Sequence, residues 1–259
     1  MNRLPVHLLT YSLINDTGIE TDAGVQPWEP DQNGPGDIRR AQVLPKPYIA
    51  FGKLNLPDKL AFSAASLLLS DRTGLPSETT GVVLGIPFGS LSTDRLYRES
   101  VKQGNPSPAL FSATLPSSPI ADVAIYYKLK GPNTVFSGGD SPLLSAIEYS
   151  RMLLETGILT DALVLLVDEP CDPASGQPLP APFAAALLLS TRREFSLYAP
   201  TMVFSSAEKQ DTPLDEYSSD RDLIVTLIQE LRKKESVRIP VPASGFKGYI
   251  SLHYPRKDY

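Results

Sequence analysis

The chain has 259 residues, 42% of them hydrophobic, which is enough for one large domain or for one domain with a small appended part. Its formal charge of −5 argues against a nucleic-acid-binding surface, because no face rich in Lys and Arg emerges beyond 233–234 and 256–257. The sequence contains no 18-residue apolar run and no leader with a cleavage site, so we expect no membrane span and a cytoplasmic location.

Cysteine and histidine are scarce, and this restricts the possible chemistry. Cys171 is the single cysteine, so the chain cannot form an internal disulfide, and it lies in a proline-rich loop where we expect an unreactive thiol. His7 falls within an apolar strand and His253 within a terminal strand, so both are predicted to be structural. We therefore expect neither a metal nor a cofactor.

The first third of the chain predicts two buried strands with a helix between them. The strands are expected at 6–14 and 80–86, and the helix, which has an apolar face rich in small residues, at 56–70. Residues 15–46 are rich in Gly, Pro and Asp and predict a long loop. The segment at 85–89 is not a phosphate loop, because the Lys-Ser/Thr and the helix that should follow it are missing.

The middle of the chain, from 131 to 169, predicts the unit around which the rest is organised. Helices expected at 94–103 and 120–129 lead into a short strand at 134–137, and two glycines then allow a tight turn. Ser141 and Pro142 follow as an N-cap and a first helical residue, and the helix ends near Gly157.

A buried strand at 161–168 completes the unit as strand, crossover helix and parallel strand. The helix carries a polar stripe of Glu148, Arg151 and Glu155, which predicts a face that is wet or covered only by a C-terminal helix.

The turn before this helix is the candidate site. Its residues Asp140 and Ser141 stand at a helix N-terminus, where the helix dipole favours an anion or lowers the pKa of a thiol. No cysteine occupies the turn. Ser141 could act as a nucleophile only with a base in reach, and no histidine is predicted nearby. Both residues are also preferred capping types, so a purely structural role is the alternative.

The last part of the chain changes character near residue 193. After a proline-rich loop, strands are expected at 183–192 and 194–204, a helix after the capping box at 219–222, and a short strand at 249–253. We therefore expect a domain over 1–193 and a short helix–strand appendage over 194–259.

The order of these segments resembles the N-terminal half of a β-ketoacyl-acyl-carrier-protein (ACP) synthase, in the thiolase-like superfamily. The similarity runs over about residues 5–193 and rests on Gly-Val-Val-Leu-Gly at 81–85, Pro-Ala-Leu-Phe-Ser-Ala-Thr-Leu-Pro at 108–116, and the segments 125–133, 137–144, 161–169 and 184–189. The resemblance implies an α/β fold with a mixed, mainly parallel sheet of about five strands flanked by helices.

The resemblance also implies that catalytic parts are missing. Asp140 stands at the position of the family's nucleophilic cysteine and cannot carry an acyl group as a thioester. The family's two histidines and its lysine belong to a second half, which is reduced here to residues 194–259 with His253 as the only histidine. Chain length factors are relatives that have lost the cysteine and pair with an active ketosynthase.

We therefore expect a catalytically degenerate, chain-length-factor-like subunit that pairs with an active ketosynthase and an ACP. The pathway classes implied are fatty acid, polyketide or aryl-polyene-like biosynthesis, and a homodimer is also open. The alternative is a free-standing malonyl-ACP decarboxylase or acyltransferase that uses the turn from Ser137 to Ser141. A third option is a binding or scaffold protein that kept only the fold.

Overall fold

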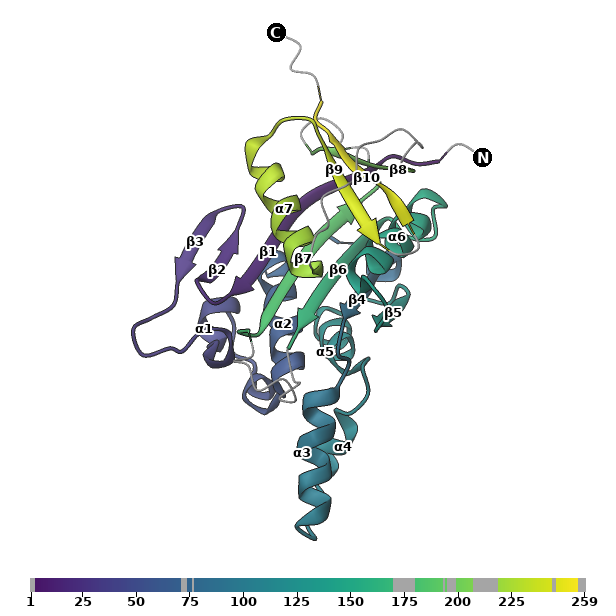
Figure 1. Cartoon of the computed structure of the whole chain (residues 1–259). Helices are drawn as coiled ribbons and strands as arrows, with labels where there is room; N and C mark the ends of the chain where they lie inside the picture. The colour runs from purple at the N-terminus through teal and green to yellow at the C-terminus, as the bar shows by residue number, and fades with distance from the viewer. Residues whose placement is uncertain are drawn as a thin grey trace.

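The computed structural model describes residues 3–70, 74–75, 77–169, 180–192, 194, 199–206, 219–243 and 246–255. They form one mixed β-sheet with helices on both faces (Figure 1). None of the helices in these ranges has the length and apolar character needed to cross a bilayer.

Five strands make up the centre of the sheet. In spatial order they are β5 (Asn133–Ser137), β4 (Thr80–Ile86), β6 (Asp161–Asp168), β7 (Phe183–Ser190) and β1 (Val6–Asn15). β4 is parallel to both β5 and β6, whereas β7 is antiparallel to its neighbours β6 and β1. Four of the five strands therefore run in one direction, which confirms the expected mixed, mainly parallel α/β arrangement.

In the described residues the sheet has ten strands, which is more than the five or so expected. Beyond β1 it continues through β8 (Thr201–Ser206), β10 (Phe246–His253) and β9 (Val237–Ala243), and a hairpin of β2 (Gly18–Thr21) and β3 (Gly24–Pro27) also pairs with β1. The hairpin lies where a long loop was predicted, and its Gly/Asp-rich sequence gives little strand signal. Proline argues against a strand except at the edge of a sheet, so the run that contains Pro240 was not recognised. β9 is an edge strand, where proline is tolerated.

The helices form two layers and one projecting arm. Helices α2 (Leu56–Leu69) and α5 (Ser118–Tyr127) pack on one face, while α6 (Pro142–Glu155) and α7 (Asp220–Lys233) pack on the other. Helices α3 (Leu91–Lys102) and α4 (Pro108–Ser112) extend away from the sheet as an arm (Figure 1). Shorter turns are α1 (Arg40–Val43), η1 (Pro35–Asp37), η2 (Ile49–Lys53) and η3 (Ser77–Thr79).

The alternation of side chains along β6 explains its continuous apolar sequence. Ala162, Val164 and Leu166 belong to the core under α6 and α7, whereas Leu163 and Leu165 belong to the core under α2 and α5. Because both faces of the strand are buried, no polar position interrupts it until Asp168.

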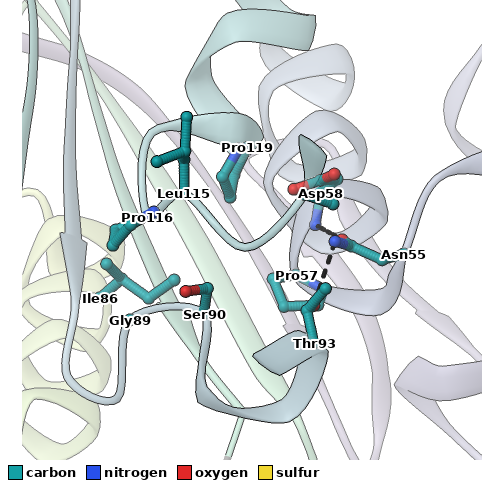
Figure 2. Close-up of a pocket in the computed structure, with 11 residues that line it drawn as sticks. Asn55, Pro57, Asp58, Ile86, Gly89, Ser90, Thr93, Leu115, Pro116 and Pro119 are labelled. Carbon is teal, nitrogen blue, oxygen red and sulfur yellow. Dashed lines mark hydrogen bonds between the residues drawn. The ribbon is translucent and has the colours of Figure 1, made fainter. Parts of the chain in front are cut away.

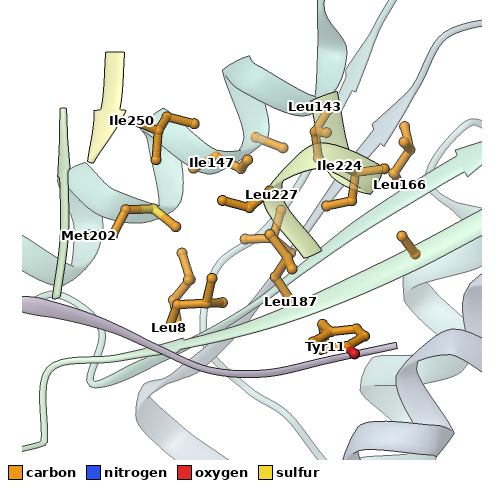
Figure 3. Close-up of a cluster of buried hydrophobic side chains, with 14 of the residues drawn as sticks. Leu8, Tyr11, Leu143, Ile147, Leu166, Leu187, Met202, Ile224, Leu227 and Ile250 are labelled. Carbon is orange, nitrogen blue, oxygen red and sulfur yellow. The ribbon is translucent and has the colours of Figure 1, made fainter. Parts of the chain in front are cut away.

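The core under α6 and α7 joins the two ends of the chain. Figure 3 shows Leu8 of β1, Ile147 of α6, Leu227 of α7 and Ile250 of β10 pointing toward one another, and all four are at most 1% exposed. The segment after 193 thus contributes β8, α7, β9 and β10 to the same sheet and core. The domain division at 193 stays a prediction.

The polar stripe of α6 is covered by more than the C-terminal helix. The Arg151 guanidinium lies 5.1 Å from the centre of the Phe204 ring on β8 and bonds Glu155 at 2.7 Å. Arg3 approaches Glu155 at 3.7 Å. β8 and the N-terminal segment therefore shield this face, which was predicted to be wet or covered by α7 alone. The prediction missed them because the sequence gave no sign that β8 would reach α6.

Candidate functional site at the turn before helix α6

The turn between β5 and α6 has the predicted strand–turn–helix geometry. Gly138 and Gly139 adopt positive φ angles of 70° and 76°, which favour glycine. Ser141 caps the helix, since its Oγ accepts a hydrogen bond from the backbone N–H of Leu144 at 3.1 Å, and Pro142 follows in the first turn. The two glycines and the Ser-Pro pair therefore place Asp140 and Ser141 at the amino end of α6.

A glycine in β4 lets this helix end approach the sheet. A Cβ atom on Gly85 would lie 2.8 Å from the backbone of Pro142 and Leu143, closer than side-chain atoms normally approach backbone. The amino end of α6 therefore rests directly on β4. A glycine within a buried strand can mark such a close approach, but this contact was not predicted from Gly85.

The two candidate residues have different surroundings. Asp140 is exposed, whereas Ser141 is half-buried and donates its hydroxyl proton to the carboxylate of Asp220, the first residue of α7. The other oxygen of that carboxylate, Oδ2, accepts the backbone N–H of Leu143 at 2.8 Å. The structure thus joins Ser141 to a carboxylate from a helix 79 residues away.

Asp220 is the residue of this site that the sequence did not reveal. Only 8% of it is exposed, and burial raises its pKa while the hydrogen bonds from Ser141 and Leu143 act in the opposite direction. In the sequence Asp220 belonged to a capping box, and Ser219 does cap α7 by accepting the N–H of Asp222. That local pattern gave no signal that Asp220 itself would reach α6.

The neighbour of Asp220 fixes the start of α7 to the sheet. Arg221 bonds the Asp168 carboxylate through Nε, the Asp168 carbonyl at 3.1 Å and the Ala181 carbonyl at 2.8 Å. Its guanidinium also lies 5.2 Å from the centre of the Phe183 ring. These partners stand at the end of β6 and the start of β7, so two consecutive residues hold α7 against both α6 and the sheet.

The histidines and the candidate turn lie at opposite ends of the sheet along the strand direction. His7 pairs in register with Ser190, Ser190 with Asp161, and Asp161 with Thr80, so His7 is level with the first residues of β6 and β4 although other strands lie between them. The turn follows the last residue of β5, whose partner is the last residue of β4. Six residue steps of about 3.3 Å separate the two ends of β4, and three further strands lie between β5 and β1, so His7 is more than about 20 Å from the turn.

Each histidine fits a structural role better than a catalytic one. His7 is 2% exposed, burial lowers its pKa, and its Nδ1 is 3.3 Å from the hydroxyl of Thr201. His253 pairs in register with Thr201 from the far side and is exposed. Neither can serve Ser141 as a base. Cys171 lies outside the described residues.

A buried carboxyl group occupies a crevice at the base of the arm (Figure 2). Asp58 is 4% exposed; its Oδ2 accepts the hydroxyl of Ser118 at 2.9 Å, and its backbone N–H donates to the Asn55 side chain at 2.9 Å. Among the described residues no group donates to its Oδ1, and the crevice has no space for a water-sized molecule. Burial raises the pKa of Asp58 to about 7, with a smaller contribution from Asp122.

Comparison with known proteins gives matches at the level of structure alone. No family model matches the sequence, and no curated protein matches it. "The ishigamide ketosynthase/chain length factor" superposes with a TM-score of 0.66 at 18% identity over 96% of this chain and 98% of that one. The ketosynthase ApeO in complex with its chain length factor ApeC, from Xenorhabdus doucetiae, gives 0.64 at 14% identity over 96% and 99%.

The chain has the fold of the ketosynthases and chain length factors. A third similar structure is a type II polyketide synthase ACP in complex with its ketosynthase, at a TM-score of 0.57, 17% identity, and 79% and 70% coverage. In the first two matches nearly all of both chains is covered, so the similarity of this ketosynthase-like fold extends past residue 193.

Proposed function

We propose that this chain is a catalytically degenerate, chain-length-factor-like subunit that pairs with an active ketosynthase. Together the two subunits would act on chains carried by an ACP in polyketide, aryl-polyene-like or fatty acid biosynthesis. The proposal rests on the fold and on the residues that form the turn before α6.

The observation that carries the proposal is the state of the turn before α6. Asp140 offers a carboxylate that cannot form a thioester, and the hydroxyl of Ser141 both caps α6 and donates to Asp220. The two histidines stand more than a strand length away. A subunit with a ketosynthase fold and, among the described residues, neither a cysteine nor a histidine beside this turn is best explained as the non-condensing member of a pair.

The projecting arm supports a role in subunit association. Leu96, Val101, Phe111 and Leu115, on α3, on α4 and just after α4, are between 48% and 61% exposed. β5 is an edge strand of the sheet, and in the part of the chain that the structure describes no strand pairs with its outer side. Large exposed apolar side chains beside an open sheet edge are typical of a protein–protein interface.

The direct test is association with a ketosynthase. The chain is co-expressed with ketosynthases from its own gene neighbourhood, and the complex is measured by size-exclusion chromatography with light scattering. We expect a heterodimer that the double substitution F111D and L115D dissociates. The control I49D introduces the same charge at a residue that is 89% exposed but lies outside the arm, and it should leave the complex intact.

Two results would contradict the proposal. One is failure to associate with any ketosynthase encoded nearby, and the other is acylation of the isolated chain by acyl-ACP, detected as a mass increase of the intact protein. If acylation occurred and S141A removed it, the chain would instead be a free-standing acyltransferase. Malonyl-ACP decarboxylation lost on substituting Asp140 and Ser141 by alanine would identify a decarboxylase.

A further inference from the structure

The amino end of α6 provides the kind of environment that attracts negative charge. The first N–H groups of a helix have no partner within the helix, and the helix dipole places partial positive charge there. In this chain the N–H of Leu143 and the hydroxyl of Ser141 both donate to the carboxylate of Asp220. An anion from the chain itself therefore already occupies this position.

We propose that α7 blocks the candidate turn. It places the Asp220 carboxylate at the amino end of α6, where a reactive anion would otherwise be stabilised. A thiolate or an oxyanion formed beside Ser141 would meet a buried negative charge, and the repulsion would cancel the help of the helix dipole. The turn is thus made unreactive by the Asp220 carboxylate as well as by the lack of a cysteine in it. This inference does not depend on the proposed pairing with a ketosynthase.

Two kinds of contact hold α7 in this position. Arg221 attaches the start of α7 to the carboxylate and carbonyl of Asp168. Further along the helix, Ile224 and Leu227 are at most 1% exposed and lie in the core shared with α6, as Figure 3 shows. Because α7 is held by both a charged contact and an apolar one, Asp220 is a fixed part of the corner.

The test measures how strongly Asp220 opposes a negative charge beside it. A thiol is introduced by S141C in a background with C171S, so that position 141 carries the only cysteine. The pKa of this thiol is obtained from the rate of alkylation by iodoacetamide as a function of pH. The same measurement is made with D220N, which removes the charge and keeps the shape, and with D222N as the matched control.

Asp222 is a suitable control because it stands in the same first turn of α7 but is exposed, and it bonds Ser219 of its own helix. We expect D220N to lower the thiol pKa by about one unit or more and D222N to leave it nearly unchanged. An unchanged pKa in D220N, or an equal shift in both variants, would overturn the proposal.

A second measurement uses the unmodified sequence, so it does not depend on how the variants fold. The backbone amide resonance of Leu143 is followed by NMR as the pH is lowered. We expect its chemical shift to titrate with a carboxyl group whose pKa is above that of an ordinary aspartate, since the amide donates to Asp220. A Leu143 resonance that stays constant through this range would also overturn the proposal.

Discussion

The buried carboxyl group of Asp58 should make the stability of the folded chain depend on pH. Its pKa is 3.8 in an unfolded chain and about 7 in the folded one. Between these values the folded state keeps a proton that the unfolded state has released, so the free energy of unfolding falls as the pH rises. Each unit of difference corresponds to about 1.4 kcal/mol, which sets an upper limit of about 4 kcal/mol for the whole range.

The substitution Asp58→Asn isolates this contribution. Asparagine has nearly the same shape, and its oxygen can accept the hydroxyl of Ser118 as Asp58 does now at 2.9 Å. Its side chain does not ionise, so the variant should lack this part of the pH dependence. We expect the stability of D58N relative to the parent to increase by about 3 kcal/mol from pH 5 to pH 8 and to level off above pH 8.

Urea unfolding at half-unit pH intervals, followed by circular dichroism, gives the required free energies. Other buried carboxyl groups such as Asp220 and Glu169 also have raised pKa values, but they are present in both proteins and cancel in the difference. The exposed Asp16 supplies a matched substitution away from the crevice, and D16N should not reproduce the rise that is expected of D58N between pH 5 and pH 8. If the curves of D58N and the parent were parallel between pH 5 and pH 8, the assignment of a buried, proton-binding Asp58 would be wrong.

Three further substitutions test the geometry of the corner, each by the free energy of unfolding in urea. Gly85→Ala should cost about 1 to 3 kcal/mol, because the new Cβ meets the backbone of α6 at 2.8 Å, whereas Gly36→Ala, with no atom within 4 Å, should have little effect. Asp140→Ala should leave stability unchanged, since Asp140 is exposed, and a loss above about 1 kcal/mol would contradict this. Arg221→Met should cost about 2 kcal/mol, because Asp168 loses a charged hydrogen-bond partner; an unaltered stability would show that this contact does not anchor α7.

The elements that the sequence predicted well are those whose pattern is set locally. β4 and β6 are buried on both faces, so each appears as an uninterrupted apolar run, and the predicted bounds agree with the structure. The turn before α6 was predicted because Gly138, Gly139 and Ser141-Pro142 are chemically specific to such a turn.

The features that were missed depend on partners far away in the chain. The hairpin of β2 and β3 forms in a segment of turn-rich composition, where Trp28 helps to hold it by donating to the carbonyl of Asn15 at 2.9 Å. The contact of Asp220 with Ser141 spans 79 residues, and nothing in either local sequence specifies it. The raised pKa of Asp58 likewise arises from burial beneath the arm, which composition and periodicity do not reveal.

The position of β1 affects how the polypeptide can fold as it leaves the ribosome. This strand is synthesised before the strands that flank it, since His7 pairs with Ser190 on one side and Thr201 on the other, 183 and 194 residues later. At a synthesis rate of 5 to 20 residues per second, these partners emerge about 10 to 40 s after it. Until then the strand lacks both of these sheet neighbours, and the hairpin beyond Ser12 pairs with only part of it. The nascent chain must therefore keep an apolar segment without its final sheet partners while more than 180 further residues are added.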